Sequence, residues 1–201
     1  EGREDIRQAC LNAPKYGNDD DYADFIARAV QHGSEAAMES VKDRFGYSIR
    51  GDGSAVSATY GLAADTPATP DGRRDGDPFA DSTLAPQPGA DRKGPTAVLN
   101  SCAKIDTLQS FNHLLNQKFL PQYLEGDMKP VFLSYLKTWR EKKIPHIQFN
   151  VVDKKTLIDA QQYPEKYRDL IVRVAGFSAY FADLSRGLQD HIIARTEHDL
   201  R

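Results

Sequence analysis

The sequence predicts an α/β fold, because segments of strand composition alternate with segments of helical periodicity. Two short stretches, 146–152 and 170–174, are rich in β-branched and aromatic residues and are predicted strands. Apolar residues at helical spacing predict helices over 154–162 and 185–195. The predicted strands are too few and too dispersed for a complete sheet. A chain of 201 residues is therefore expected to be part of a larger fold.

The N-terminal region is predicted to begin with helix and continue as irregular strand. A helix over 20–45 starts at an aspartate cap, Asp20 or its neighbour, and carries apolar residues at helical spacing. Gly33 and the following serine are expected to interrupt it, and Gly46 to end it. Residues 47–64 alternate loosely between apolar and small residues, which predicts a short irregular strand region.

Residues 65–95 are dense in Pro, Gly and Asp. They include two apolar side chains, Phe79 and Leu84, that can anchor the segment. We therefore expect an ordered loop wrapped on a larger body and not a disordered linker. Further along, the pattern predicts a strand at Thr96–Leu99 and helices over 108–120 and 131–140.

Composition excludes several classes of function. Acidic residues outnumber basic residues 29 to 26, the formal net charge is −3, and the basic residues are scattered, so no nucleic-acid partner is expected. No window approaches the roughly 18 consecutive apolar residues of a membrane span, and no signal segment opens the sequence, so the cytoplasm is the expected compartment. The two cysteines and five histidines lack the spacing of a metal site, and none is predicted.

The chain opens with Glu1 in the middle of a helical charge pattern. This opening suggests a piece cut from a longer protein, or one paired with another chain.

Gly176 lies between two apolar, β-prone runs. An isolated glycine at such a place ordinarily makes a tight turn, because it adopts positive φ without steric cost. Its neighbours, however, form the run Arg173–Val174–Ala175–Gly176–Phe177–Ser178–Ala179–Tyr180–Phe181.

That run resembles the radical motif of the glycyl radical enzymes, the superfamily of pyruvate formate-lyase. Further blocks, in order, are similar to the same superfamily: 68–74, 94–99, 146–152, the approach to the loop around 156–167, and the tail at 190–197. The resemblance implies that the chain is the C-terminal part of a ten-stranded α/β barrel. Residues 1–145 would belong to the barrel domain and 146–201 to the glycyl radical domain.

The resemblance also implies the chemistry. Gly176 would store a backbone radical, supported by the loop residues Arg173, Ala175, Phe177 and Ser178. A separate iron–sulfur activating enzyme that uses S-adenosylmethionine would install it, in the cytoplasm of an anaerobic organism. The radical is delocalised best on a residue without Cβ, and it must be kept from solvent, as a loop between buried strands would do.

In this superfamily the glycyl radical takes a hydrogen atom from a cysteine on a second loop, and the thiyl radical then attacks a small organic substrate. Neither Cys10 nor Cys102 stands in the sequence context of that cysteine, and both are expected to be structural. The chain therefore needs an upstream catalytic portion or subunit, which could form a dimer of the whole enzyme. A non-catalytic protein that repairs an oxygen-cleaved enzyme is the alternative of another class.

The reaction is indicated less directly. Local blocks at 76–81 and 115–119 are similar to the synthases that add toluene or alkanes to fumarate, and arylacetate decarboxylases are similar over the same stretch. Diol dehydratases and C–N lyases remain alternatives. Candidate pocket residues are Ser57, Thr59, Tyr60 and Gln148, with Asn150 near them. A simpler interpretation of the Gln148 and Asn150 side chains is that their amides satisfy backbone groups between packed strands.

Overall fold

A computed structural model describes residues 3–51, 59–108, 112–195 and 197–198 of the chain. Its N-terminal half is helical, and its strands lie in the C-terminal half. The helices are α1 (Glu4–Asn12), α2 (Asp21–Ser40), α3 (Thr59–Ala64), α4 (Pro95–Ala103), α5 (Lys129–Glu141), α6 (Lys154–Gln162) and α7 (Arg186–Ala194). Within these described ranges, short 3-10 turns lie at Pro121–Leu124, Gly126–Met128, Pro164–Lys166 and Phe181–Asp183.

The strands form a small parallel sheet and a separate hairpin. The sheet has the order β2 (Gln148–Val151), β1 (Asn116–Phe119) and β5 (Glu197–His198), with β1 parallel to both neighbours. The hairpin joins β3 (Ile171–Arg173) to β4 (Ser178–Tyr180). A parallel sheet connected by helices confirms the predicted α/β class.

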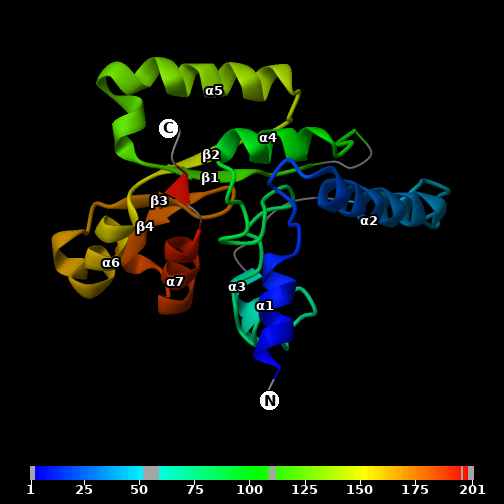
Figure 1. Cartoon of the computed structure of the whole chain (residues 1–201), viewed down its shortest axis with the longest axis horizontal. Helices are drawn as coiled ribbons and strands as arrows, with labels where there is room; N and C mark the ends of the chain where they lie inside the picture. The colour runs from blue at the N-terminus through cyan, green and yellow to red at the C-terminus, as the bar shows by residue number, and fades with distance from the viewer. Residues whose placement is uncertain (1–2, 52–58, 109–111, 196, 199–201) are drawn as a thin grey trace.

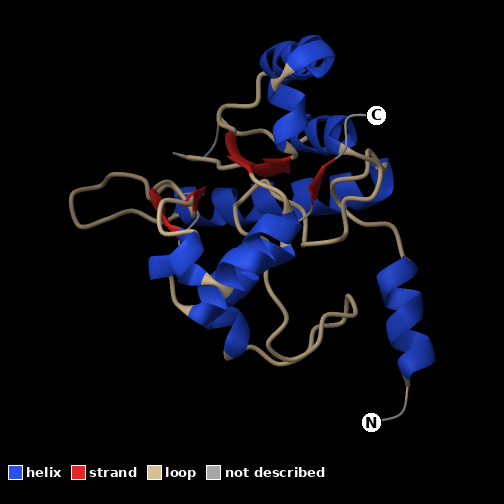
Figure 2. Cartoon of the chain, turned by 90° about the vertical axis from the view of Figure 1, so that its left-hand side faces the viewer, coloured by secondary structure: helices blue, strands red, loops and turns tan. Residues whose placement is uncertain are grey.

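Helices cover one face of the parallel sheet and the hairpin unit lies beyond the other (Figure 1). Phe119 of β1 is fully buried, and its ring lies 5.5 Å from Phe132 and 5.1 Å from Tyr135, both on α5. Helix α4 adds Leu99 and its neighbours to the same core. Figure 2 shows these strands in the interior, with helices on either side.

A second core lies beneath the hairpin. Leu157 of α6, Val172 of β3 and Ile192 of α7 are fully buried in it, together with Phe181 just after β4. The hairpin is thus packed on one side against α6 and α7, which fixes its direction relative to the sheet.

The long loop between α3 and α4 is held by buried contacts of its own. Arg73 donates hydrogen bonds to the carbonyls of Ala63 (2.8 Å) and Pro67 (2.9 Å), and its guanidinium lies 4.3 Å from the centre of the Phe79 ring. Leu84 is buried in the first core. These contacts bring the loop against the body of the chain.

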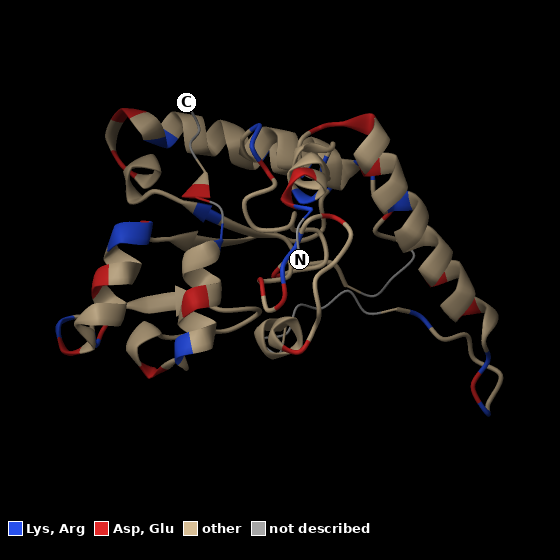
Figure 3. Ribbon diagram, turned by 60° about the horizontal axis from the view of Figure 1, so that its bottom comes forward, with Lys and Arg blue, Asp and Glu red and all other residues tan. Residues whose placement is uncertain are grey.

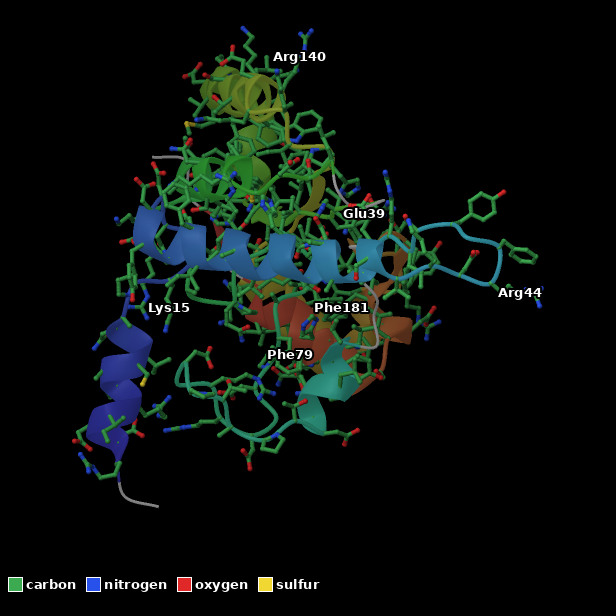
Figure 4. The ribbon with its side chains drawn as sticks, turned by 90° about the vertical axis from the view of Figure 1, so that its right-hand side faces the viewer. Lys15, Glu39, Arg44, Phe79, Arg140 and Phe181 are labelled. Carbon is green, nitrogen blue, oxygen red and sulfur yellow. The ribbon has the colours of Figure 1, made fainter. Side chains whose placement is uncertain are left out.

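Helix α2 differs from the prediction at both its middle and its end. It runs without a break through Gly33 and stops at Ser40, not at Gly46. The Asp20 side chain caps it by accepting from the Ala23 amide, at 3.3 Å. Gly46, with φ +87°, instead turns a small loop closed by the Ile49 amide on the Val41 carbonyl (3.2 Å). Figure 4 shows Arg44 on this loop, projecting beyond Glu39 at the end of α2.

Three further predictions were wrong. The strand expected within 47–64 is replaced over its described last part by helix α3, and the strand at Thr96–Leu99 is part of helix α4. Helix α4 begins with Pro95, which follows Gly94 at φ +85°. Proline is common at the first position of a helix, but the β-prone residues after it led to the prediction of a strand. The helix predicted over 108–120 is strand β1 in its described C-terminal part. All four β1 residues are buried, so no alternation marked it as a strand.

Candidate functional site

Gly176 lies at the tip of the β3–β4 hairpin. The ladder pairs Arg173 with Ser178, and the Val174 amide donates to the Phe177 carbonyl at 2.9 Å, so Ala175 and Gly176 are the two turn residues. Gly176 has φ +76°, whereas Ala175 does not have positive φ. Glycine adopts such a positive φ without steric cost, so the backbone at this turn position favours glycine. A Cβ built on Gly176 would meet no atom within 4 Å, so the backbone conformation, and not the space, selects glycine here.

The turn is buried on one side only. Val174 and Ala175 are buried, while Gly176 is exposed and the Phe177 side chain is 46% exposed. The expected loop between buried strands is therefore found only in part: the residues directly before Gly176 are buried, and those directly after it are exposed. The hairpin packs on α6 and α7 through one face, and its other face has no cover within the part of the chain that the structure describes.

The Gln148 side chain lies directly under the turn. Its Oε1 accepts from the Arg173 Nε at 2.9 Å and faces the Gly176 amide at 3.4 Å. Its Nε2 donates to Oδ1 of Asn116, the residue opposite it on β1. Because one end of the amide donates to Asn116, the other end is fixed as the acceptor toward Gly176.

Asn150, two residues along β2, joins the hairpin to the parallel sheet. Its Oδ1 accepts from the Arg173 amide and its Nδ2 donates to the Arg173 carbonyl, both at 2.7 Å. The side chain therefore takes the place of a neighbouring strand for that residue. The Arg173 side chain in turn donates to Ser178 Oγ across the hairpin, at 3.2 Å.

The structure thus brings Arg173, Ser178 and Gln148 together beside Gly176, with Ala175 and Phe177 flanking it. Asn116 was missed from the sequence, whereas the bonds of Asn150 to the Arg173 backbone agree with the simpler interpretation of that amide. The sequence does contain a pattern that indicates this cluster. Polar residues two positions apart occur in both strands, Asn116 and Lys118 in β1 and Gln148 and Asn150 in β2. Residues two apart in a strand lie on the same face of the sheet.

The other candidate pocket residues lie elsewhere or outside the described residues. Ser57 is outside them. Thr59 and Tyr60 begin α3, where the Tyr60 hydroxyl pairs with Ser185 Oγ at 3.3 Å. The Tyr60 ring lies against Gly187 of α7, so this part of the expected pocket is a packing contact between α3 and α7.

Burial shifts the pKa of two side chains, His146 and Cys102. Burial and the nearby Arg173 cation lower the pKa of His146. Cys102, in the first core, accepts from the Tyr16 hydroxyl at 3.4 Å, and burial raises the pKa of its thiol to about 12. A thiol with so high a pKa holds its proton at neutral pH, as expected of a structural cysteine.

Over the described ranges, no group of three or more His, Cys, Asp or Glu side chains could hold a metal ion. Within the same ranges, no helix is both long and apolar enough to cross a membrane. Lysine, arginine and acidic residues are interspersed over the helices (Figure 3).

Two family patterns match the chain. The family described as Glycine radical matches residues 80–182, which include the whole β3–β4 hairpin, and the family described as Pyruvate formate lyase-like matches residues 1–61.

The chain is similar in sequence to lyases, dehydratases and decarboxylases that are longer than it is. The chain is 43% identical to an isethionate sulfite-lyase of Desulfovibrio desulfuricans, over all of this chain and 24% of that protein. It is 44% identical to the probable dehydratase YbiW of Escherichia coli, over 98% of this chain and 25% of that protein. An indoleacetate decarboxylase of Tractidigestivibacter scatoligenes is 40% identical over 96% of this chain.

Solved structures agree in fold. The 1,2-propanediol-dehydrating enzyme of Roseburia inulinivorans superposes with a TM-score of 0.91 at 44% identity, over 97% of this chain and 25% of that one. The hydroxyproline dehydratase of Clostridioides difficile superposes with a TM-score of 0.91 at 40% identity, over 98% and 25%. The chain therefore spans about a quarter of the length of these relatives and has the fold of their C-terminal barrel portion.

Proposed function

The chain belongs to the glycyl radical enzyme family, and we propose that Gly176 is the residue on which it stores the radical. The observation that carries this proposal is the position of Gly176 at the tip of the hairpin, at φ +76° and with no atom near the place of a Cβ. Loss of one Cα hydrogen leaves a planar centre shared with the flanking amide and carbonyl groups. A residue with a side chain would host that centre less well, and it would also strain this turn.

The radical has to be passed on by a hydrogen-atom transfer. A cysteine S–H bond would break and the Gly176 Cα–H bond would re-form, which leaves a thiyl radical on the cysteine. Cys102 is buried in the first core and hydrogen-bonded to Tyr16, so it is a poor donor to an exposed turn. We assign the donor to a further catalytic portion, on the same polypeptide or on a second one.

Exposed apolar surface supports such a portion. Ile171, Phe177 and Tyr180 are 46–58% exposed around the turn, and Phe25, Ile26 and Val30 are exposed along α2. Apolar surface that gathers in this way marks a contact with more protein. The same contact would cover Gly176 and exclude oxygen from it.

Installation of the radical is assigned to a separate activating enzyme that uses S-adenosylmethionine and an iron–sulfur cluster. The hairpin suits delivery to such an enzyme, because its tip is formed by two residues and its outer face is open. We also keep 146–201 as the radical domain, supported by the second core, although β2 pairs with β1 of the preceding region.

For the reaction we propose elimination of a leaving group from a small organic substrate. Relatives named for dehydration or sulfite release match nearly the whole chain. Hydrocarbon addition to fumarate, indicated by local sequence blocks, and arylacetate decarboxylation remain the competing assignments. Gln148 is assigned to the floor of the turn and not to substrate.

The test is activation under strict exclusion of oxygen, followed by electron paramagnetic resonance. We expect a doublet that is lost in Gly176→Ala and kept in Gly76→Ala. The two substitutions are matched, since Gly76 has φ +73° and also has no atom within 4 Å of a built Cβ. Each should cost about 1–2 kcal/mol of folding free energy. A doublet that persists in Gly176→Ala would overturn the assignment.

Turnover distinguishes the remaining alternatives. With the cysteine-bearing portion present, propanediol, trans-4-hydroxyproline and isethionate test elimination, while toluene with fumarate tests addition. A chain that takes up the radical but restores activity only to an oxygen-cleaved enzyme would be the repair protein. The matches at residues 1–61 favour the enzyme, because they extend upstream of the radical domain.

A further inference from the structure

Arg195, the residue that ends α7, points into the interior beneath the hairpin. It is only 8% exposed. Its Nη1 donates to the Arg173 carbonyl at 2.8 Å and its Nη2 donates to the Val174 carbonyl at 2.5 Å. Its Nε lies 2.5 Å from the Asp81 carboxylate, which is itself buried. One guanidinium thus contacts the long loop and the last two residues before the turn.

The chemistry of these contacts requires an arginine. The guanidinium is a planar fork, and here each edge of the fork meets a different acceptor. A lysine has one nitrogen and could not reach both carbonyls and the carboxylate in the same geometry. Burial lowers the pKa of Arg195, and the Asp81 carboxylate opposes that shift. The ion pair therefore offsets part of the cost of placing a cation here.

The two carbonyls are well placed to control the turn. Val174 and Arg173 come directly before Ala175 and Gly176, and the Arg173 carbonyl is also bonded to Asn150. On the other arm of the turn, the ladder, the Ser178 contact and the bond from the Val174 amide to the Phe177 carbonyl join the two strands. Arg195 couples the start of the turn to α7 and to the long loop.

We propose that Arg195 is a positioning residue that holds the radical turn docked, with Asp81 fixing its guanidinium. The inference rests on the proposed function of Gly176. Release of Arg195 from the two carbonyls would let the hairpin tip move away from the sheet. The radical would then be less protected, while the chemistry of the glycine itself would be unchanged.

The experiment uses the complete chain together with its cysteine-bearing portion. Arg195→Lys keeps the charge and loses the fork, and Asp81→Asn keeps the shape and loses the pairing charge. Two controls are matched to them. Arg186→Gln removes a charge from the exposed side of the same helix, and Leu157→Ala destabilises the second core without touching Arg195.

The readouts are hydrogen exchange of peptides covering residues 171–180 and the rate of backbone cleavage when the activated protein meets air. We expect Arg195→Lys to raise both rates about tenfold over the unsubstituted chain, and Asp81→Asn to raise them less, because the docked turn opens more often. Leu157→Ala should lower the unfolding midpoint as much or more with a smaller change in both rates. Arg186→Gln should change neither.

Equal rates in Arg195→Lys and Leu157→Ala would overturn the positioning role and leave a structural one. If Arg195→Lys fails to fold, Asp81→Asn decides alone: unchanged exchange and cleavage in that variant would also overturn it. Absence of any radical in the unsubstituted chain would contradict the proposed function instead, and the hydrogen-exchange comparison would still test Arg195.

Discussion

Neutral amide side chains support the turn at Gly176, together with the Arg173 and Arg195 side chains. Gln148 and Asn150 on β2, with Asn116 on β1, satisfy one another and the backbone of the hairpin. The sequence offered two interpretations of Gln148 and Asn150, a substrate pocket or hydrogen bonds to backbone groups. Their contacts with Arg173 and Gly176 are of the second kind. Three amides with fixed partners give the turn one orientation, and none of the three carries a charge.

Replacing Gln148 by Leu should destabilise the chain. Gln148→Leu removes the acceptor for Arg173 Nε and leaves the buried Asn116 Oδ1 without its donor. We expect a loss of about 1–3 kcal/mol in the free energy of unfolding, measured by urea denaturation.

Gln161→Leu is the control for Gln148→Leu, because Gln161 bonds Asp190 on the exposed surface. Its effect should stay within about 0.5 kcal/mol. Equal effects of the two substitutions would show that the Gln148 amide contributes no more to the free energy of unfolding than an exposed amide does.

The elements that sequence reasoning missed share a cause. Strand β1 is buried on both faces, so its residues carry no period of two, and the apolar residues before it suggested a helix. Helix α4 is apolar and β-prone, and only Pro95 indicated its start. Helices α5, α6 and α7 and the hairpin strands were predicted because their periodicity or composition is strong. Helices α5 and α6 also begin with a Pro or Asp signal.

Helix α2 gives an element-scale prediction. Gly33 lies inside this helix without positive φ, and a Cβ there would meet nothing within 4 Å. Gly33→Ala should therefore stabilise the chain by about 0.5–1 kcal/mol, because alanine loses less backbone entropy on folding than glycine. Thermal unfolding followed by circular dichroism measures this.

Gly76→Ala serves as the opposite control to Gly33→Ala, since its positive φ makes alanine unfavourable. If Gly33→Ala lowered the midpoint as Gly76→Ala does, the helix would be broken at Gly33, as the sequence first suggested.

At the scale of the whole molecule, histidines make the fold sensitive to acid. His113, His191 and His198 are buried, and burial lowers the pKa of each from its ordinary value of 6.5. For His198, burial and the Lys118 cation bring the pKa to about 4. A carboxylate lies near each of them: Glu35 at 3.7 Å from His113, Asp91 at 3.2 Å from His198, and Asp81, whose charge opposes the lowering of the His191 pKa.

The sign follows from these lowered values. Below pH 6.5 the unfolded chain takes up protons on these histidines while the folded chain stays neutral there. Stability should thus be fully present above about pH 6.5 and fall as the pH drops, by up to about 1.4 kcal/mol per pH unit for each histidine. Urea titrations at pH 7.5, 6.5 and 5.5 measure the slope, which should be shallower in His198→Gln. A free energy of unfolding that is constant over this range would contradict the prediction.

The sequence was sufficient to predict the family, but not the exposure of Gly176 or the contacts between residues distant in sequence. The motif around Gly176 identified the family, because its residues form one hairpin whose turn requires glycine. The exposure of Gly176 could not be read from it, because exposure depends on which residues distant in sequence pack against the turn. Arg195 and Asp81 meet across 114 positions of sequence, and no local pattern predicts that contact.

The most direct test of the radical assignment is the product formed in air. After anaerobic activation, exposure to oxygen should break the backbone at Gly176 and separate residues 1–175 from the C-terminal remainder, as mass spectrometry of the fragments would show. Gly176→Ala should stay intact under the same treatment, and Gly76→Ala should be cut like the unsubstituted chain. An activated chain that stays whole in air, or that breaks at another residue, would contradict storage of the radical on Gly176.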